Sequence, residues 1–182
     1  MMLKNDYDFI ASSETIDDIK QNIAPFSFRW AYPIALELQK NDYRLAIRWA
    51  VECVEMFTLE YEPNNFPKLE KYLKQAMEES NQNALTSLEC SEIAKKLWYS
   101  PQREDAQTAI ARIWWSIQAF KDGHEIDGII EVEMAVELSL PDTELNIENH
   151  LLLDRYLEIG LRIYRDYDFQ TNQLPEFKQG KI

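Results

Sequence analysis

The chain has 182 residues, 46% of them hydrophobic and 12% aromatic, which suits one domain with a buried core and excludes global disorder. Its formal net charge of −13 argues against nucleic-acid binding, because that binding depends on phosphate neutralisation by Lys and Arg. An anionic membrane surface would repel such a chain as well. The four glycines form no cluster, which excludes the glycine-rich loops that cradle phosphates.

Neither the cysteines nor the N-terminus points to a secreted or membrane protein. Cys53 and Cys90 stand singly in apolar stretches, where a thiol behaves as a small buried hydrophobe, so they predict neither a zinc site nor a disulfide framework. The opening MMLKNDYDFIASSE has no long apolar region, and no window reaches the ~18 consecutive apolar residues of a membrane span. We therefore expect a cytoplasmic protein.

The N-terminal part of the chain predicts an arm, a short helix and a strand-like segment. Residues 1–12 are expected to form a loose arm. Ser12 or Ser13 then caps a short helix that ends near Ile23. In segment 26–32, aromatic residues alternate with small or polar ones, a pattern typical of a strand.

Two helices are predicted next. Pro33 fits the first turn of a helix that runs to about Lys40. Asp42 can cap a helix over residues 43–61, which has a broad apolar surface. Its single polar stripe consists of Arg44, Arg48, Glu52 and Glu55. A helix this apolar is expected at the centre of a bundle.

Three further amphipathic helices are predicted before residue 123. The first begins at Pro67, and its apolar residues follow the i, i+3, i+4, i+7, i+8 spacing of a helix face. The second covers 84–98. The third is predicted to begin at Ser100 and Pro101, a capping residue followed by proline at the first helical position, and to stop near Gly123.

Segment 128–140 allows two interpretations. Its apolar residues alternate with glutamates, which is typical of a strand. A lone strand cannot satisfy its backbone hydrogen bonds, and the only matching partner would be 26–32. Every other long segment is helical, which favours a helix here, but the alternation leaves a short ribbon of these two segments open.

The last segments complete a prediction of an all-α fold. Pro141 and Asp142 open a long helix over about 143–168, followed by a polar C-terminal tail over 169–182. We predict a helical bundle of about six to eight helices, with at most one short β-ribbon. A single helical domain is expected to cover 13–168.

No catalytic, cofactor-binding or metal-binding residues are predicted. Histidine is the usual general base near neutral pH, and the chain has only His124, in a glycine-flanked turn, and His150. His150 and Asp154 have an i, i+4 spacing that two metal ligands can share. A di-iron carboxylate bundle, however, needs two Glu-x-x-His motifs, and Ile147 and Lys121 stand where its glutamates would be.

The charge distribution is the most informative feature for function. Between Asp122 and Asp154 lie ten of the 32 acidic residues and no Lys or Arg, which leaves 22 acidic and 19 basic residues elsewhere. Solubility alone can explain such a run. The functional interpretation is a face that meets a basic protein partner. The candidate partner-binding residues are Glu125, Asp127, Glu131, Glu144 and Trp115, the last expected to be partly exposed beside a core Trp114.

This interpretation predicts a non-enzymatic, acidic protein-binding module, with two alternatives. If Glu133 and Glu137 are buried around a cavity with raised pKa values, they become acid/base groups of a helical enzyme or small-ligand-binding domain. If they are exposed, they belong to the charged face. The other alternative is a homo-oligomeric structural protein, joined through 26–32 or 130–140.

Segment 43–79 carries a resemblance to a known family. Its elements are Trp49-Ala50, Cys53-Val54-Glu55, a proline loop that ends at Pro67 and the amphipathic helix after it. They resemble the opening of a helical immunity-protein family of bacterial toxin systems, although that family is alanine-rich where this chain has its Glu-rich stretch. The resemblance implies a small helical bacterial protein that binds and neutralises a toxin, and it carries over no catalytic residue.

Overall fold

The computed structural model is all-helical in the part of the chain that it describes, residues 8–26, 29–101, 104–140 and 147–172. In those residues it has eight α-helices, one 3-10 turn and no strand. The elements are α1 (Ile16–Ile23), η1 (Ala24–Phe26), α2 (Ala31–Asn41), α3 (Tyr43–Tyr61), α4 (Phe66–Gln82), α5 (Ser87–Trp98), α6 (Asp105–Lys121), α7 (Glu125–Leu138) and α8 (Ile147–Asn172). None of these helices is both long enough and apolar enough to span a membrane.

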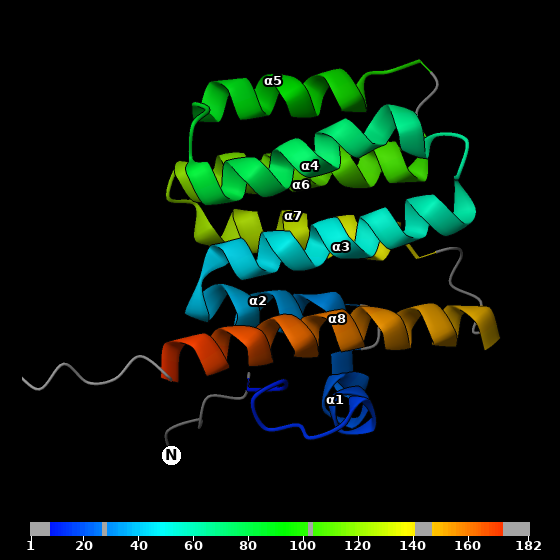
Figure 1. Cartoon of the computed structure of the whole chain (residues 1–182), viewed down its shortest axis with the longest axis vertical. Coiled ribbons are helices and arrows are strands. Elements are labelled where there is room, and N and C mark those ends of the chain that lie inside the picture. The colour runs from blue at the N-terminus through cyan, green and yellow to red at the C-terminus, as the bar shows by residue number, and fades with distance from the viewer. Residues whose placement is uncertain (1–7, 27–28, 102–103, 141–146, 173–182) are drawn as a thin grey trace, which may run out of the picture.

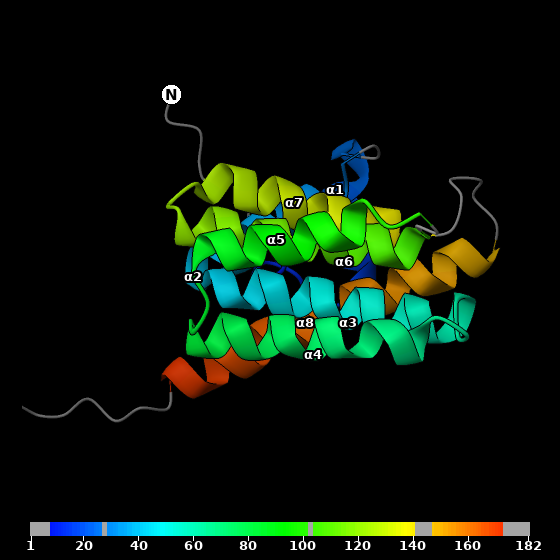
Figure 2. The same ribbon diagram turned by 90° about the horizontal axis from the view of Figure 1, so that it is seen from above.

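The helices form two packed layers (Figures 1 and 2). Helices α5, α6, α7 and α2 lie side by side in one layer, and α4, α3 and α8 form the other. Helix α1 packs against α8 at one end of the molecule. The α2–α3, α4–α5 and α6–α7 junctions all lie at the same side of the bundle, on the left in Figure 1. Residues far apart in the sequence therefore meet there.

Helix α3 is central, as its apolar composition predicted, because it contacts α2, α4, α6, α7 and α8. Asp42 caps it, as predicted, by accepting a hydrogen bond from the backbone N–H of Arg44 at 3.0 Å. The fully buried Trp49 donates its indole N–H to the carbonyl oxygen of Tyr156 at 2.8 Å. Gly160 leaves room for this contact, since a Cβ there would lie 3.3 Å from the Trp49 indole nitrogen.

Three helices begin at other residues than predicted, and one of them is α5, which starts at Ser87 after the capping residue Thr86 and not at residue 84. Thr15, not Ser12 or Ser13, caps α1 through a reciprocal capping box with Asp18, while the two serine hydroxyls donate to backbone carbonyls four residues earlier. Helix α6 begins at Asp105 rather than at Pro101.

A long-range contact accounts for the later start of α6. The backbone N–H of Ala106 lies in the first turn of α6, where the helix offers it no acceptor. It donates instead to the carboxylate of Glu62 at 3.1 Å. Glu62 is the C-cap residue of α3. The sequence near Pro101 holds no sign of this partner, so local capping rules could not find the boundary.

Segment 128–140 is helical, so the favoured interpretation of that segment is confirmed and a ribbon is not found among the described residues. The buried positions of α7 follow a helical spacing and are Gly128, Ile129, Val132, Glu133, Ala135 and Val136. One of these buried positions is Glu133. A glutamate at a buried position made the sequence of this segment look like the alternation of a strand. Segment 26–32, the strand partner considered, contains instead the end of η1 and the start of α2 at Ala31.

The described part of the N-terminal arm is packed rather than loose. Phe9 and Ile10 are buried. The backbone N–H groups of Ile10 and Ala11 donate to the carboxylate of Glu37 at 2.7 and 2.8 Å. The arm expected over 1–12 is therefore bound to α2 from residue 8 onward, because a buried glutamate 26 or 27 residues away accepts its hydrogen bonds.

Helix α8 runs to Asn172, past residue 168 where the last helix was expected to end. The polar tail expected over 169–182 therefore begins with a helical stretch. The predicted opening of this helix at Pro141 lies outside the described residues.

The buried hydrophobic side chains form one continuous cluster between the two layers. Its largest fully buried members are Trp49, Trp114 and Tyr156, so Trp114 is a core residue, as predicted. Cys53 and Cys90 are both buried and free, and burial raises the pKa of the Cys53 thiol well above its ordinary value.

Candidate functional site

The acidic residues at the junction of α6 and α7 form an exposed corner. We define the acidic corner as residues 122–127, all six of which are exposed. Gly123 has a left-handed φ of 76° and donates to the carbonyl of Phe120, while the N–H of His124 reaches back to Ala119 at 2.8 Å. These paired bonds end α6 in a Schellman motif. The corner is therefore a hydrogen-bonded turn with a defined shape.

The charges of the acidic corner are not compensated nearby. Asp122, Glu125 and Asp127 form no ion pair within the described part of the chain. The two cations on α6, Arg112 and Lys121, are both paired with other carboxylates. Two of the corner acids lie in the first turn of α7, where the helix dipole also favours them.

Lys121, next to the corner, belongs to a buried pair. Its ammonium lies 2.6 Å from Glu79 of α4, and both side chains are almost completely buried. Glu79 also accepts the backbone N–H groups of Ala84 and Leu85. This network attaches the C-terminal end of α6 to the α4–α5 junction, and it removes a cation that would otherwise neutralise the corner.

Beside the corner lies an open depression of about 420 Å³, which we call the α6–α7 depression. Its lining includes Arg112, Trp115, Asp122, Asp127 and Glu131. On α6, positions 112 and 115 lie on the side of the helix away from its buried isoleucines, because a helix turns by 100° per residue. The depression therefore opens on the outer surface of the α5–α6–α7 layer.

Trp115 lines this depression and packs against Trp98 of α5, which lies behind it. The rings of Trp98 and Trp115 have centroids 5.1 Å apart. The guanidinium of Arg112 lies 4.6 Å from the Trp98 centroid and 5.4 Å from the Trp115 centroid. It also donates to Glu131 at 3.1 Å. Partial burial raises the pKa of the Glu131 carboxyl, against the opposing effect of Arg112.

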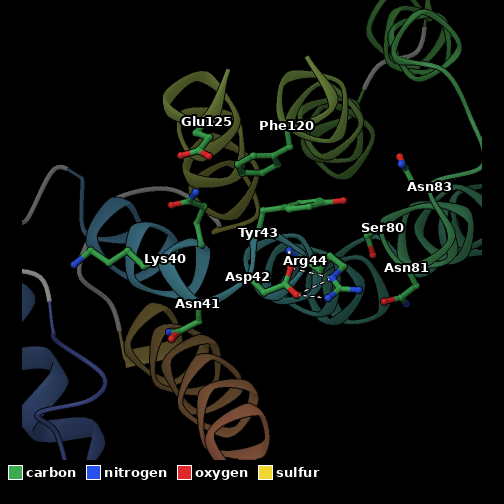
Figure 3. Close-up of a pocket in the computed structure, with 11 residues that line it drawn as sticks. Lys40, Asn41, Asp42, Tyr43, Arg44, Ser80, Asn81, Asn83, Phe120 and Glu125 are labelled. Atoms are coloured by element: carbon green, nitrogen blue, oxygen red, sulfur yellow. Dashed lines mark hydrogen bonds and ion pairs between the residues drawn. The ribbon is translucent and has the colours of Figure 1, made fainter. Parts of the chain in front are cut away.

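A second and larger depression, of about 760 Å³, lies on the other side of the corner (Figure 3). We call it the amide-lined depression, because Asn41, Asn81 and Asn83 contribute to its lining. The rings of Tyr43 and Phe120 pack against each other, 5.1 Å between centroids, and Figure 3 shows both beside Glu125.

Gly128 determines where the Phe120 ring lies. A Cβ on Gly128 would come within 2.7 Å of that ring, so only glycine allows this close approach. The amide-lined depression thus has an aromatic wall that depends on α7, the helix that also carries the corner acids.

The structure brings some of the predicted partner-binding residues together and separates others. Trp115, Asp127 and Glu131 line the α6–α7 depression, although Glu131 is bound to Arg112. Glu125 instead faces the amide-lined depression. Glu144 lies outside the described residues.

Sequence reasoning did not select Trp98 and Arg112. The i, i+3 spacing of Arg112 and Trp115 places these two side chains on one helix face, which was a usable signal. Nothing in the sequence indicated that Trp98 of the preceding helix would lie beneath them.

The two glutamates that divided the functional alternatives have different environments. Glu133 is only 3% exposed, and Arg29 holds it through two bonds of 2.6 and 2.5 Å. Glu137 is half-buried. Burial and the charge of Glu133 raise the pKa of Glu137 to about 7, although Arg29 and the N–H of Ala31 oppose this rise. Neither glutamate lines the two depressions described above.

Metal-ligating chemistry finds no support in the described residues, where no group of three or more His, Cys, Asp or Glu side chains is arranged to hold an ion. The side chain of His150, considered as a ligand with Asp154, is outside the described part.

Comparisons with protein-family models, with curated proteins and with solved structures find no match. What the corner offers chemically is unpaired carboxylates beside an aromatic surface, which suits recognition of a cation.

Proposed function

We propose that this protein is a non-enzymatic binding module that meets a basic protein partner through the acidic corner and the α6–α7 depression. The observation that carries the proposal is the unpaired state of Asp122, Glu125 and Asp127, while the neighbouring Arg112 and Lys121 are held in ion pairs. Uncompensated surface charge accelerates association with a partner of opposite charge and raises specificity.

The corner also supplies the apolar contacts that a protein interface needs. Ile126 is 66% exposed and lies among the corner acids. Trp115 is partly exposed on the neighbouring helix. Tryptophan is enriched among the residues that dominate binding energy at interfaces. Ile126 with the acids around it resembles such an interface, in which an apolar core is surrounded by a polar rim.

The resemblance of residues 43–79 suggests a bacterial toxin as the partner. Those residues form α3 and α4, which contribute to the core and to the layer opposite α7. The resemblance therefore supports the kind of partner, while the choice of binding surface rests on the corner alone.

Neutralising the corner tests this proposal. In the variant Asp122→Asn, Glu125→Gln, Asp127→Asn, we expect an intact fold and association with the partner that is slower by about tenfold at low salt, with a flatter salt dependence. The partner is first captured from a bacterial extract with the unmodified protein, and on-rates are then measured over a range of salt concentrations.

The matched control removes three exposed acids on α1 and α8 instead: Asp17→Asn, Glu158→Gln and Asp166→Asn. It changes the net charge by the same amount. If both variants slow association equally, only the overall charge matters and the corner is not the binding surface.

A second candidate function rests on Glu137, whose pKa of about 7 suits a general acid or base. It corresponds to the alternative of a helical enzyme or small-ligand-binding domain with buried carboxylates. Glu133 is bound by Arg29, and neither Glu133 nor Glu137 lines a depression through which a substrate could reach it. We therefore place this function second. Labelling of Glu137 by a water-soluble carbodiimide and a small amine would show that it is accessible to a substrate.

The homo-oligomer alternative required an apolar surface at 26–32 or 130–140. In the second segment, Val132, Ala135 and Val136 are buried in the core of the chain itself. These side chains are not available to a second copy, so we do not propose an oligomer through α7.

A further inference from the structure

We propose that the α6–α7 depression receives one lysine or arginine side chain of the partner. This inference rests on the proposed function and adds the position at which the partner's positive charge is bound. It follows from the charge, the aromatic wall and the size of the depression.

The charges around the depression favour a cation. Arg112 and Glu131 neutralise each other through contacts of 3.1 and 3.2 Å. Asp122 and Asp127 line the same space, are exposed and have no ionic partner among the described residues. The local excess is therefore negative, and a volume of about 420 Å³ admits one long basic side chain.

The aromatic wall offers a second attraction to a cation. Trp98 and Trp115 already bind one guanidinium, that of Arg112, at 4.6 and 5.4 Å from their ring centroids. The face of an aromatic ring attracts cations, tryptophan most strongly. Because Trp115 packs on Trp98, its ring is held in place before the partner arrives, which reduces the entropy lost on binding.

The amide-lined depression shows why this site, and not the larger one, is assigned to a cation. Its lining holds two carboxylates, Asp42 and Glu125, and two cations, Lys40 and Arg44, so its formal charge sums to zero. Asp42 is already bound to Arg44. That depression has no excess of negative charge, so it has no preference for a positively charged group.

Short peptides provide a probe that needs no identified partner. Acetyl-Gly-Arg-Gly-amide and its lysine counterpart are titrated into the ¹⁵N-labelled protein at pH 7.5 and low salt, and the five tryptophan indole signals are followed by NMR. We expect saturable shifts of the Trp115 signal with both peptides, while the buried Trp49 and Trp114 signals stay in place. The neutral glutamine peptide should produce no such shift.

Substitutions localise the effect. Asp127→Asn and Asp122→Asn should each weaken peptide binding by about threefold to tenfold, and both together should abolish saturation. Asp166→Asn, on the exposed side of α8, should leave binding unchanged and serves as the matched control. Equal binding by the Asp127→Asn and Asp166→Asn variants, or an equal shift with the glutamine peptide, would overturn the inference.

The two proposals fail in distinguishable ways. If corner neutralisation slows association with the partner but the cationic peptides leave Trp115 unshifted, the basic-side-chain site is rejected and the proposed function stands. If the peptides bind at Trp115 but corner neutralisation leaves the partner's on-rate unchanged, the proposed function is rejected. A shift with the arginine peptide alone would assign the site to a guanidinium, and shifts with both would assign it to either basic side chain.

Discussion

Three glutamates, Glu37, Glu79 and Glu133, are almost completely buried, and each is satisfied by a different kind of donor. Glu37 accepts two backbone N–H groups of the N-terminal arm. Glu79 combines an ammonium with backbone N–H groups, and Glu133 accepts two bonds from one guanidinium. Removing the cation that is paired with a buried carboxylate leaves that carboxylate's charge uncompensated, which costs more than the pair itself contributes.

The Glu79–Lys121 pair leads to a prediction about stability. Glu79→Gln keeps the size of the side chain but leaves the Lys121 ammonium without its counter-charge in a buried position. We expect the free energy of unfolding to fall by about 3 kcal/mol, measured by urea denaturation at pH 7.5. Glu78→Gln, an exposed neighbour on the same helix, should leave the midpoint unchanged. Equal midpoints for the two variants would show that the pair contributes little.

Glu137 makes the stability of the protein depend on pH. Its pKa rises from an ordinary 4.5 to about 7 in the folded chain, mainly through burial. Between these two pH values the folded state holds a proton that the unfolded state has lost, so stability decreases as the pH rises. Above pH 7 the group is ionised in both states, and the full destabilisation is present.

Glu137→Gln should remove this contribution. Because the side chain is partly solvated, we expect a gain of about 1–2 kcal/mol at pH 8, and no gain at pH 4. The difference in free energy of unfolding between variant and unmodified protein, measured from pH 4 to pH 8, should grow with pH. A difference that stays constant over this range would contradict the prediction.

At the scale of single elements, α7 shows how burial can hide a helical pattern. Its alternating apolar residues and glutamates are typical of a strand, yet its buried side includes Gly128 and Glu133. Arg29 makes the buried glutamate tolerable, and a glycine fits where the Phe120 ring lies close. With both exceptions explained, the buried positions of α7 follow the ordinary spacing of one helix face.

Gly128 provides the test at this scale. In Gly128→Ala the new Cβ would lie 2.7 Å from the Phe120 ring, so the ring must shift away from α7 and its packing on Tyr43 must change. We expect a loss of about 1–2 kcal/mol in thermal or urea unfolding, even though alanine favours a helix more than glycine does. The double variant Gly128→Ala, Phe120→Leu should recover part of the loss. If the single variant is more stable than the unmodified protein, the close contact carries no strain.

At the scale of the whole molecule, the two-layer packing brings several helix junctions to one side (Figure 1). The acidic corner lies there between two depressions, one with an excess of negative charge and one with balanced charge. The negative run between Asp122 and Asp154 is therefore not a uniform face. Glu133 lies in the core and Glu131 is paired, and among the side chains of this run that the structure describes, the exposed acids without an ion pair are those of the corner.

The sequence by itself determined most of the helical architecture. The limits of α3, its cap at Asp42 and the burial of Trp114 followed from local rules, because capping and periodicity act over a few residues. The composition of α3 also predicted its central place, because a helix that is apolar nearly all round must be covered on nearly all sides. The charge run also pointed to the α6–α7 region from sequence alone.

Only the tertiary structure decided which of the acidic residues remain free. Arg29 binds Glu133 across 104 residues of sequence, and Arg112 binds Glu131 across 19. Lys121 is bound by Glu79 from a different helix. A cation and an anion in different helices meet only once the layers have packed, because periodicity assigns each side chain to a face of its own helix and not to a partner. The candidate site is therefore a property of the packed bundle, although every residue in it is visible in the sequence.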